Sequence, residues 1–111
     1  MVEVTFHAYP DGRLGITARG HAGFGRKGQD IVCAAVSILT LTAAEEARRL
    51  YEQGLLRCCP ETVLREGFAS VTVCPLPRFR QQVSASFRFA RTGLRLLARQ
   101  YPRHVRLKGR I

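Results

Sequence analysis

The residues with the clearest chemical potential lie in one glycine-rich stretch, GHAGFGRKGQDIVCAAVS, at positions 20–37. It places a histidine, His21, twelve positions before a cysteine, Cys33. Asp30 suits the N-cap of a helix, and Cys33 would then occupy the third helical position. Unpaired backbone N–H groups and the positive end of the helix dipole favour an anion there, so this position would favour a thiolate.

Cysteine catalysis needs a base beside the sulfur, and often a third group that orients the base. His21 is the candidate base, and Asp30 is the candidate orienting group, although a role as N-cap would compete with that task. The backbone N–H groups after Cys33 are candidate donors to an oxyanion. Ser37, one turn further on, could bond near the sulfur or to its own helix backbone. A cysteine alone is more often structural than nucleophilic, and His21 is what favours catalysis here.

The same stretch also contains the G-x-G-x-x-G spacing of a dinucleotide-binding loop, in Gly23, Gly25 and Gly28. That fingerprint requires a parallel βαβ unit and an acidic residue about 20 positions later, at the end of the next strand. Here an antiparallel hairpin is predicted before the loop, and the next acidic residues fall inside the predicted helix. We therefore interpret the glycines as giving mobility to the loop over residues 20–29.

The remaining cysteines and histidines show no spacing typical of a catalytic or metal site. Cys58, Cys59 and Cys74 lack the paired C-x-x-C spacing of a structural zinc site, so we expect no metal and no cofactor. His7 and His104 are expected at the surface.

The chain starts without a basic and apolar leader, and its longest apolar run is far short of the roughly 20 residues that cross a bilayer. Four cysteines in such a chain indicate free thiols in the cytoplasm.

Hydrophobic periodicity predicts the elements that must position these residues. The predicted order is ββαββα(β), an α/β (α+β) two-layer sandwich with two helices on one face of a mixed or antiparallel sheet, in one domain over residues 1–111. The two β-hairpins turn at PDG and at Glu66–Gly67, and the first helix ends near Gly54. The predicted segments, in chain order, are 2–9, 13–20, 31–53, 62–67, 68–76, 81–101 and 104–111.

The basic charge is concentrated in the C-terminal part of the chain. The formal net charge is +10, and of the 18 Lys and Arg residues eight precede Gly67 and ten follow it, whereas all eight acidic residues precede it. The second predicted helix carries an apolar stripe and, on the opposite side, a row of arginines that are candidate RNA contacts. A polyanion, an acidic partner or plain solvation would each fit this row: Arg88, Arg91, Arg95 and Arg99.

The stretch 20–37 closely resembles the signature of the bacterial ribosomal-processing cysteine proteases, the Prp family: G-H-A-G-[YF], a glycine-containing loop, then D-I-V-C-A-A-V-S. The resemblance implies a small two-layer α/β fold, usually homodimeric, and a Cys/His endopeptidase. It implies that the enzyme takes part in ribosome maturation. Its substrate would be the twenty-seventh protein of the large subunit, from which it removes a short N-terminal extension by cutting after a phenylalanine.

Matched by residue, the resemblance makes Cys33 the nucleophile and His21 its partner, with Asp30 and Ser37 as supporting positions. The loop over residues 22–29 would be a lid over the substrate, with Gly23, Phe24, Gly25 and Gly28 as its lid residues. The chain departs from the pattern in Phe24, where tyrosine is frequent, and in its basic C-terminal half. A ribosome-associated RNA-binding or assembly factor without catalytic activity is the alternative.

Overall fold

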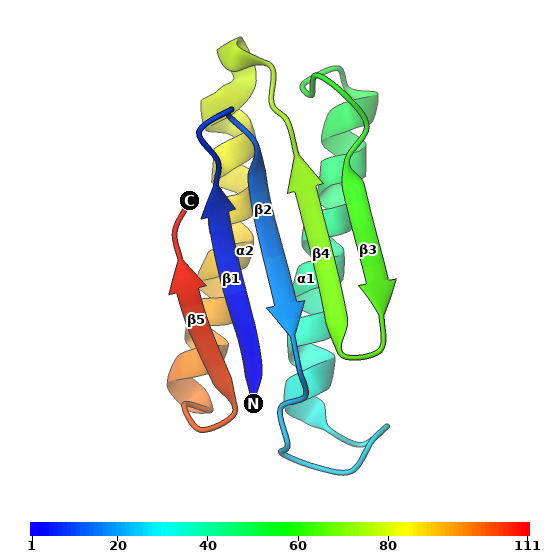
Figure 1. Ribbon diagram of the computed structural model, residues 1–111, viewed down its shortest axis with the longest axis vertical. Helices are drawn as coiled ribbons and strands as arrows, with labels where there is room; N and C mark the ends of the chain where they lie inside the picture. The colour runs from blue at the N-terminus through cyan, green and yellow to red at the C-terminus, as the bar shows by residue number, and fades with distance from the viewer.

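The computed structural model describes all 111 residues, and every predicted element is present with its ends shifted by a few residues (Figure 1). Two long helices, α1 and α2, and five strands, β1 to β5, follow one another along the chain in the predicted order ββαββαβ. Their bounds, with one 3₁₀ turn η1, are β1 (Val2–Ala8), β2 (Leu14–Arg19), α1 (Ile31–Glu52), β3 (Glu61–Arg65), β4 (Phe68–Val73), η1 (Pro77–Phe79), α2 (Arg80–Gln100) and β5 (Val105–Gly109).

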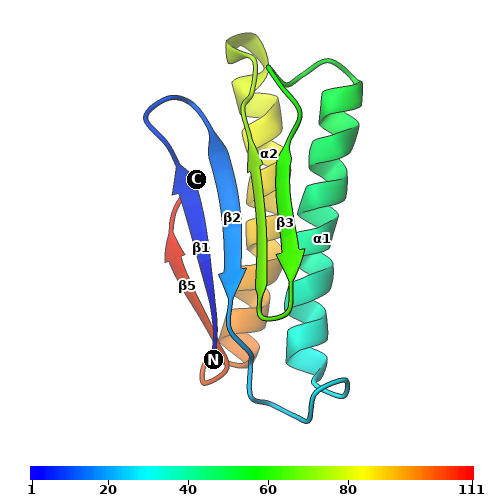
Figure 2. The same cartoon turned by 45° about the vertical axis from the view of Figure 1, so that its right-hand side comes forward.

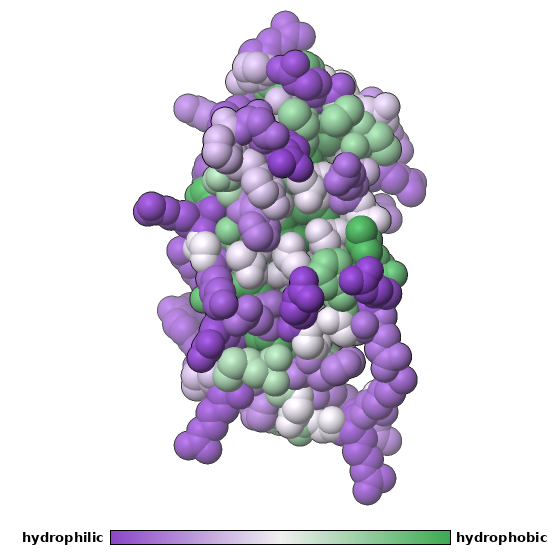
Figure 3. All heavy atoms as spheres, in the orientation of Figure 1, coloured by the Kyte–Doolittle hydropathy of each residue, from purple (hydrophilic) through white to green (hydrophobic).

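The sheet has the strand order β3-β4-β2-β1-β5. Both hairpins and the β2–β4 pair are antiparallel, whereas β5 pairs in parallel with β1, so the sheet is mixed. Both helices lie on one face of it, as predicted (Figure 2). The opposite face is uncovered, and Figure 3 shows mainly hydrophilic and neutral side chains on it. Neither helix has an apolar stretch long enough to span a bilayer.

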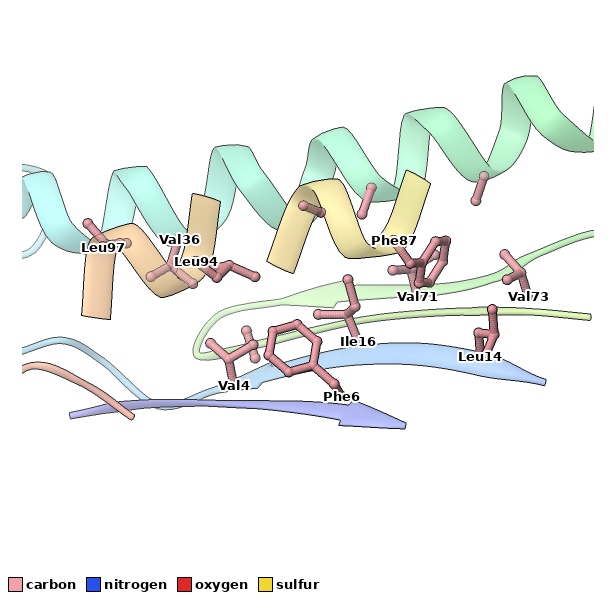
Figure 4. Close-up of a cluster of buried hydrophobic side chains, with 14 of the residues drawn as sticks. Val4, Phe6, Leu14, Ile16, Val36, Val71, Val73, Phe87, Leu94 and Leu97 are labelled. Atoms are coloured by element: carbon pink, nitrogen blue, oxygen red, sulfur yellow. The ribbon is translucent and has the colours of Figure 1, made fainter. Parts of the chain in front are cut away.

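The core lies between the sheet and the two helices (Figure 4). Alternate residues of β1 point into it, as the pattern predicts, although Ala8 at the strand end is exposed rather than inward. On α2 the predicted apolar stripe is buried, with Tyr101 only half-buried. A fully buried side chain of this kind contributes about 1.5–3 kcal/mol relative to an exposed one. The largest fully buried side chains are Phe87, Leu14, Ile16, Leu50, Leu94, Val4, Val32, Val71, Val73 and Val83.

Three chain segments meet at the end of the molecule where β2 finishes and α1 begins. The loop over residues 20–30 connects these two elements (Figure 2). Its first residue donates a backbone hydrogen bond to the β3–β4 turn, Gly20 N–H to Gly67 O at 2.8 Å. The turn between α2 and β5 reaches the same end, because the backbone N–H of Val2 donates to His104 O at 2.9 Å. The loop that carries His21 therefore lies between the β3–β4 turn, the α2–β5 turn and the start of α1.

Candidate functional site

Cys33 and His21 line one cavity of about 480 Å³ beside the first turn of α1. The cavity also takes in Asp30 and Ser37, so the structure brings together the four residues that the sequence singled out. A smaller adjacent hollow of about 250 Å³ is lined by Cys33, His21 and Ser37 again, together with the β3–β4 hairpin. Their catalytic roles stay predictions at this point, but their proximity is a feature of the fold.

The thiol of Cys33 is free and half-buried at the third residue of α1. Its Sγ accepts a hydrogen bond from the backbone N–H of Ala22 at 3.2 Å. Ala22 lies in the loop next to His21 and is only 2% exposed, so this donor is shielded from solvent. A hydrogen bond to sulfur stabilises a thiolate more than a neutral thiol, because the acceptor then carries a full charge.

The imidazole of His21 is exposed and rests against the β3–β4 turn. A Cβ atom on Gly67 would lie 3.1 Å from His21 Nε2, and Gly67 has a φ of +71°, so only glycine fits there without strain. No hydrogen bond joins this ring to the sulfur of Cys33, whose hydrogen-bond partner is Ala22. Glu66 lies beside the ring, and the pKa of its carboxyl is lowered chiefly by Lys27 and to a smaller extent by the charge of His21.

Asp30 is the N-cap of α1, which confirms the predicted cap. Its Oδ1 accepts the N–H groups of Val32 and Cys33 at 3.0 and 2.9 Å, and its Oδ2 accepts those of Phe24 and Gly25 at 2.9 and 3.1 Å. These bonds, led by the one from Cys33, lower the pKa of Asp30 against the opposing effect of burial. Four N–H donors fill the capacity of a carboxylate, so Asp30 clamps the loop to the helix and does not orient the imidazole.

Two further expectations for the helix start are not met. The first backbone N–H after Cys33, that of Ala34, bonds to Asp30 O at 3.0 Å, so it is not free to hold an oxyanion. The donor that does face the sulfur comes from the loop, from Ala22. Ser37 is exposed and bonds neither to the sulfur nor to its own helix backbone, but its side chain borders both hollows.

The loop that was predicted to be a lid, residues 22–29, forms part of the cavity wall. Gly23 and Gly28 have φ values of +69° and +84°, which glycine adopts readily, and both line the cavity with Gly25. Lys27 Nζ pairs with Glu66 Oε1 at 2.7 Å and so joins this loop to the β3–β4 turn, and both residues line the cavity. Both partners are well exposed, and exposed ion pairs are weak, so this contact is easily broken.

His104 does not line the cavity but contacts the loop beside it, and sequence reasoning missed this contact. It is half-buried instead of lying at the surface, and its Nδ1 is 2.9 Å from Ala22 O. Phe24 of the same loop packs edge-on against the rings of His104 and Tyr101, with centroids 5.3 and 5.2 Å apart. The only local signal was a candidate edge strand after α2, and its partner strand could not be read from the sequence.

The arginine row of α2 is partly as predicted. Arg88, Arg95 and Arg99 are exposed, but Arg91 is half-buried and donates from Nη1 to Ile111 O at 3.3 Å. Burial lowers the pKa of the Arg91 guanidinium, and the neighbouring charges of Arg95 and Arg88 lower it further. Among the ten basic residues after Gly67, only Lys108 forms an ion pair.

Known proteins share both the sequence pattern and the fold. The family model described as "Cysteine protease Prp" matches residues 1–106. The ribosomal processing protease Prp from S. aureus, in complex with a covalently linked product peptide, is 18% identical, with a TM-score of 0.73 over 99% of this chain and 100% of that chain. The same protease with a substrate peptide is 17% identical, with a TM-score of 0.69 over the same shares.

SMU.848 from Streptococcus mutans is 27% identical, with a TM-score of 0.68 over 98% of this chain and 93% of that chain. No curated protein matches the sequence significantly. The structural likenesses agree with the two-layer fold described above, and the family model covers nearly the whole chain. The chain therefore belongs to the Prp family, the cysteine proteases involved in ribosomal protein processing.

Proposed function

We propose that this chain, as one protease domain over residues 1–111, removes the N-terminal extension of the twenty-seventh protein of the large ribosomal subunit. The observation that carries the proposal is the single cavity that holds a free thiol at a helix start and an imidazole from the adjoining hairpin. The S. aureus protease of the same fold binds a substrate peptide and, in a second structure, a covalently linked product peptide. A peptide chain is therefore the class of substrate that this cavity should accept.

In the proposed reaction, His21 takes the proton of the Cys33 thiol, and the sulfur attacks the carbonyl carbon of the scissile peptide. The C–N bond then breaks, and the leaving amine takes the proton from His21. Water, deprotonated by His21, hydrolyses the thioester and restores the thiol. Because no hydrogen bond joins the two side chains in the structure, the His21 ring must turn from Gly67 toward the sulfur when substrate binds.

The loop over residues 22–29 acts in this proposal as the substrate lid. Asp30 clamps one part of it to α1, while the Lys27–Glu66 pair holds another part to the β3–β4 turn. Breaking that exposed pair opens the cavity, and the positive-φ glycines Gly23 and Gly28 allow the segment to move. Ser37, one turn after Cys33 on α1, also lines the cavity and would contact the bound peptide.

The test is a synthetic peptide that spans the extension and the mature N-terminus of the ribosomal protein. We expect a single cut after a phenylalanine, identified by mass spectrometry of both products. A peptide in which that phenylalanine is replaced by aspartate is the matched control and should remain uncut. Cleavage at several unrelated positions, or none at the junction, would contradict the assigned substrate.

We also propose that the protein acts as a homodimer that packs through its helix layer. Phe89 on α2 is 82% exposed and borders a groove of about 720 Å³ between the helices, whose lining includes Leu39, Gly93 and Leu96. A projecting ring and a groove on one face suit a two-fold interface, because each copy can insert its ring into the other. Sedimentation equilibrium should give a dimer for the wild type and a monomer for Phe89→Asp. Val63→Asp, on edge strand β3, should remain dimeric.

Contact with ribosomal RNA is the second candidate function, and the unpaired arginines of α2 favour it. Arg95 and Arg99 are exposed near the end of α2 that approaches the site, and no carboxylate pairs with them. Such contact would show as an affinity for RNA that falls steeply with salt, since phosphate binding releases counterions.

The four free thiols fit a reducing compartment, so we propose that the protein works in the cytoplasm with the ribosome.

A further inference from the structure

We propose that His104 is a positioning residue of this site: it holds Ala22 so that the Ala22 N–H points at the sulfur of Cys33. The inference rests on the proposed role of Cys33 as the nucleophile. It adds a second histidine, from a different part of the chain, whose task is to fix the loop and not to move the reacting proton.

Ala22 is held through both of its backbone polar groups. Its N–H donates to Cys33 Sγ at 3.2 Å, and its carbonyl oxygen lies 2.9 Å from His104 Nδ1. The next residue, Gly23, has a φ of +69° and no atom within 4 Å of a Cβ placed on it, so packing does not restrain the chain there. The carbonyl belongs to the Ala22–Gly23 peptide and the N–H to the His21–Ala22 peptide, so the imidazole fixes the first peptide directly and the second through the Cα of Ala22. Without the imidazole, only the buried methyl group of Ala22 would anchor this part of the loop, and the N–H could shift away from the sulfur.

The imidazole of His104 is itself mounted rigidly. The backbone N–H of His104 donates to Tyr101 O at 2.9 Å, and its carbonyl accepts from the N–H of Val2 at 2.9 Å. The next residue begins β5, which pairs in parallel with β1. The ring is packed edge-on against Phe24, which also meets Tyr101. A side chain anchored by the sheet can therefore hold a mobile loop in place.

The Ala22 N–H, which His104 holds in position, is the backbone donor that bonds to the sulfur of Cys33. Asp30 already takes the N–H groups of Val32 and Cys33, and that of Ala34 is bonded within the helix. The Ala22 N–H is thus what compensates negative charge on Sγ before the attack. For the bond to Ala22 O, His104 must carry a proton on Nδ1, which both the imidazolium and one neutral tautomer supply.

Two near-isosteric substitutions test the geometry. In His104→Asn the amide nitrogen can occupy the place of Nδ1, whereas in His104→Gln it reaches the place of Nε2 and loses the bond. We expect Asn to keep peptide hydrolysis within about 2-fold, and Gln or Ala to lower kcat about 10-fold with little change in KM, as the loss of one hydrogen bond implies. His7→Ala is the control, because His7 pairs with Thr17 on the uncovered face.

The second readout is alkylation of Cys33 by iodoacetamide at pH 7 and pH 9, followed by mass spectrometry without any peptide substrate. In His104→Gln the rate at pH 7 should fall about 10-fold and recover at pH 9, while His104→Asn should match the wild type. Equal alkylation in Asn and Gln variants would overturn the proposal. Because this measurement needs no cleavage, it stays decisive even if the ribosomal substrate proves wrong.

Discussion

Replacing Cys33 by alanine should abolish peptide hydrolysis, by a factor of at least about 10⁴, while the protein stays folded. The proposed reaction passes through a bond to sulfur, and no other thiol borders the cavity with His21. The side chain is half-buried, so its loss removes one heavy atom from a site that is already partly open. Initial rates with the junction peptide, beside thermal melts followed by circular dichroism, measure the two effects separately.

The other cysteines provide matched controls for this variant. Cys58 and Cys59 are exposed and Cys74 is half-buried, and alanine at each of them should leave hydrolysis unchanged. In the wild type, limiting iodoacetamide should label Cys33 before the more exposed Cys58 and Cys59, because only Cys33 has a helix start and a backbone N–H beside its sulfur. Hydrolysis that survives in Cys33→Ala would end the protease mechanism proposed here.

The parts of the site that local sequence patterns determine could be predicted. Asp30 follows a polar loop and precedes an apolar run, which is a cap signal within a few residues. That cap fixes Cys33 in the first turn, and a hairpin that ends at Arg19 must deliver His21 to the same edge of the sheet. The alternation of β1 and the 3.6-residue period of α2 likewise predicted which side chains form the core.

The parts that depend on distant segments could not be predicted. His104 reaches the loop because β5 pairs in parallel with β1, and nothing in its neighbours along the chain indicates that pairing. Glu66 enters the cavity through a turn between two strands far from Cys33 in sequence. Arg91 lies on the same side of α2 as the other arginines of the row, but it is half-buried and donates a hydrogen bond to Ile111 O, a contact between distant parts of the chain.

Replacing Asp30 by asparagine should separate its two tasks. The amide oxygen can still accept the N–H groups of Val32 and Cys33, and asparagine is a good N-cap, so α1 should persist. The amide nitrogen cannot accept from Phe24 and Gly25, so the lid loses its clamp. We expect hydrolysis to fall about 100-fold, the size of loss seen when a residue that holds the reacting groups in place is replaced. Thermal stability should change far less. Asp30→Ala removes both the N-cap of α1 and the clamp on the loop, so both hydrolysis and thermal stability should fall.

The same carboxylate gives an acid-dependent signature whose sign is fixed by its lowered pKa. A group with a native pKa below its ordinary value of 3.8 stabilises the fold fully above that value, and the stabilisation disappears as the pH falls through the lower native pKa. Melts of the wild type and Asp30→Asn should therefore differ by a constant amount at neutral pH and converge in acid. Full hydrolysis by Asp30→Asn, or a stability gap that widens in acid, would show that the loop does not depend on this clamp.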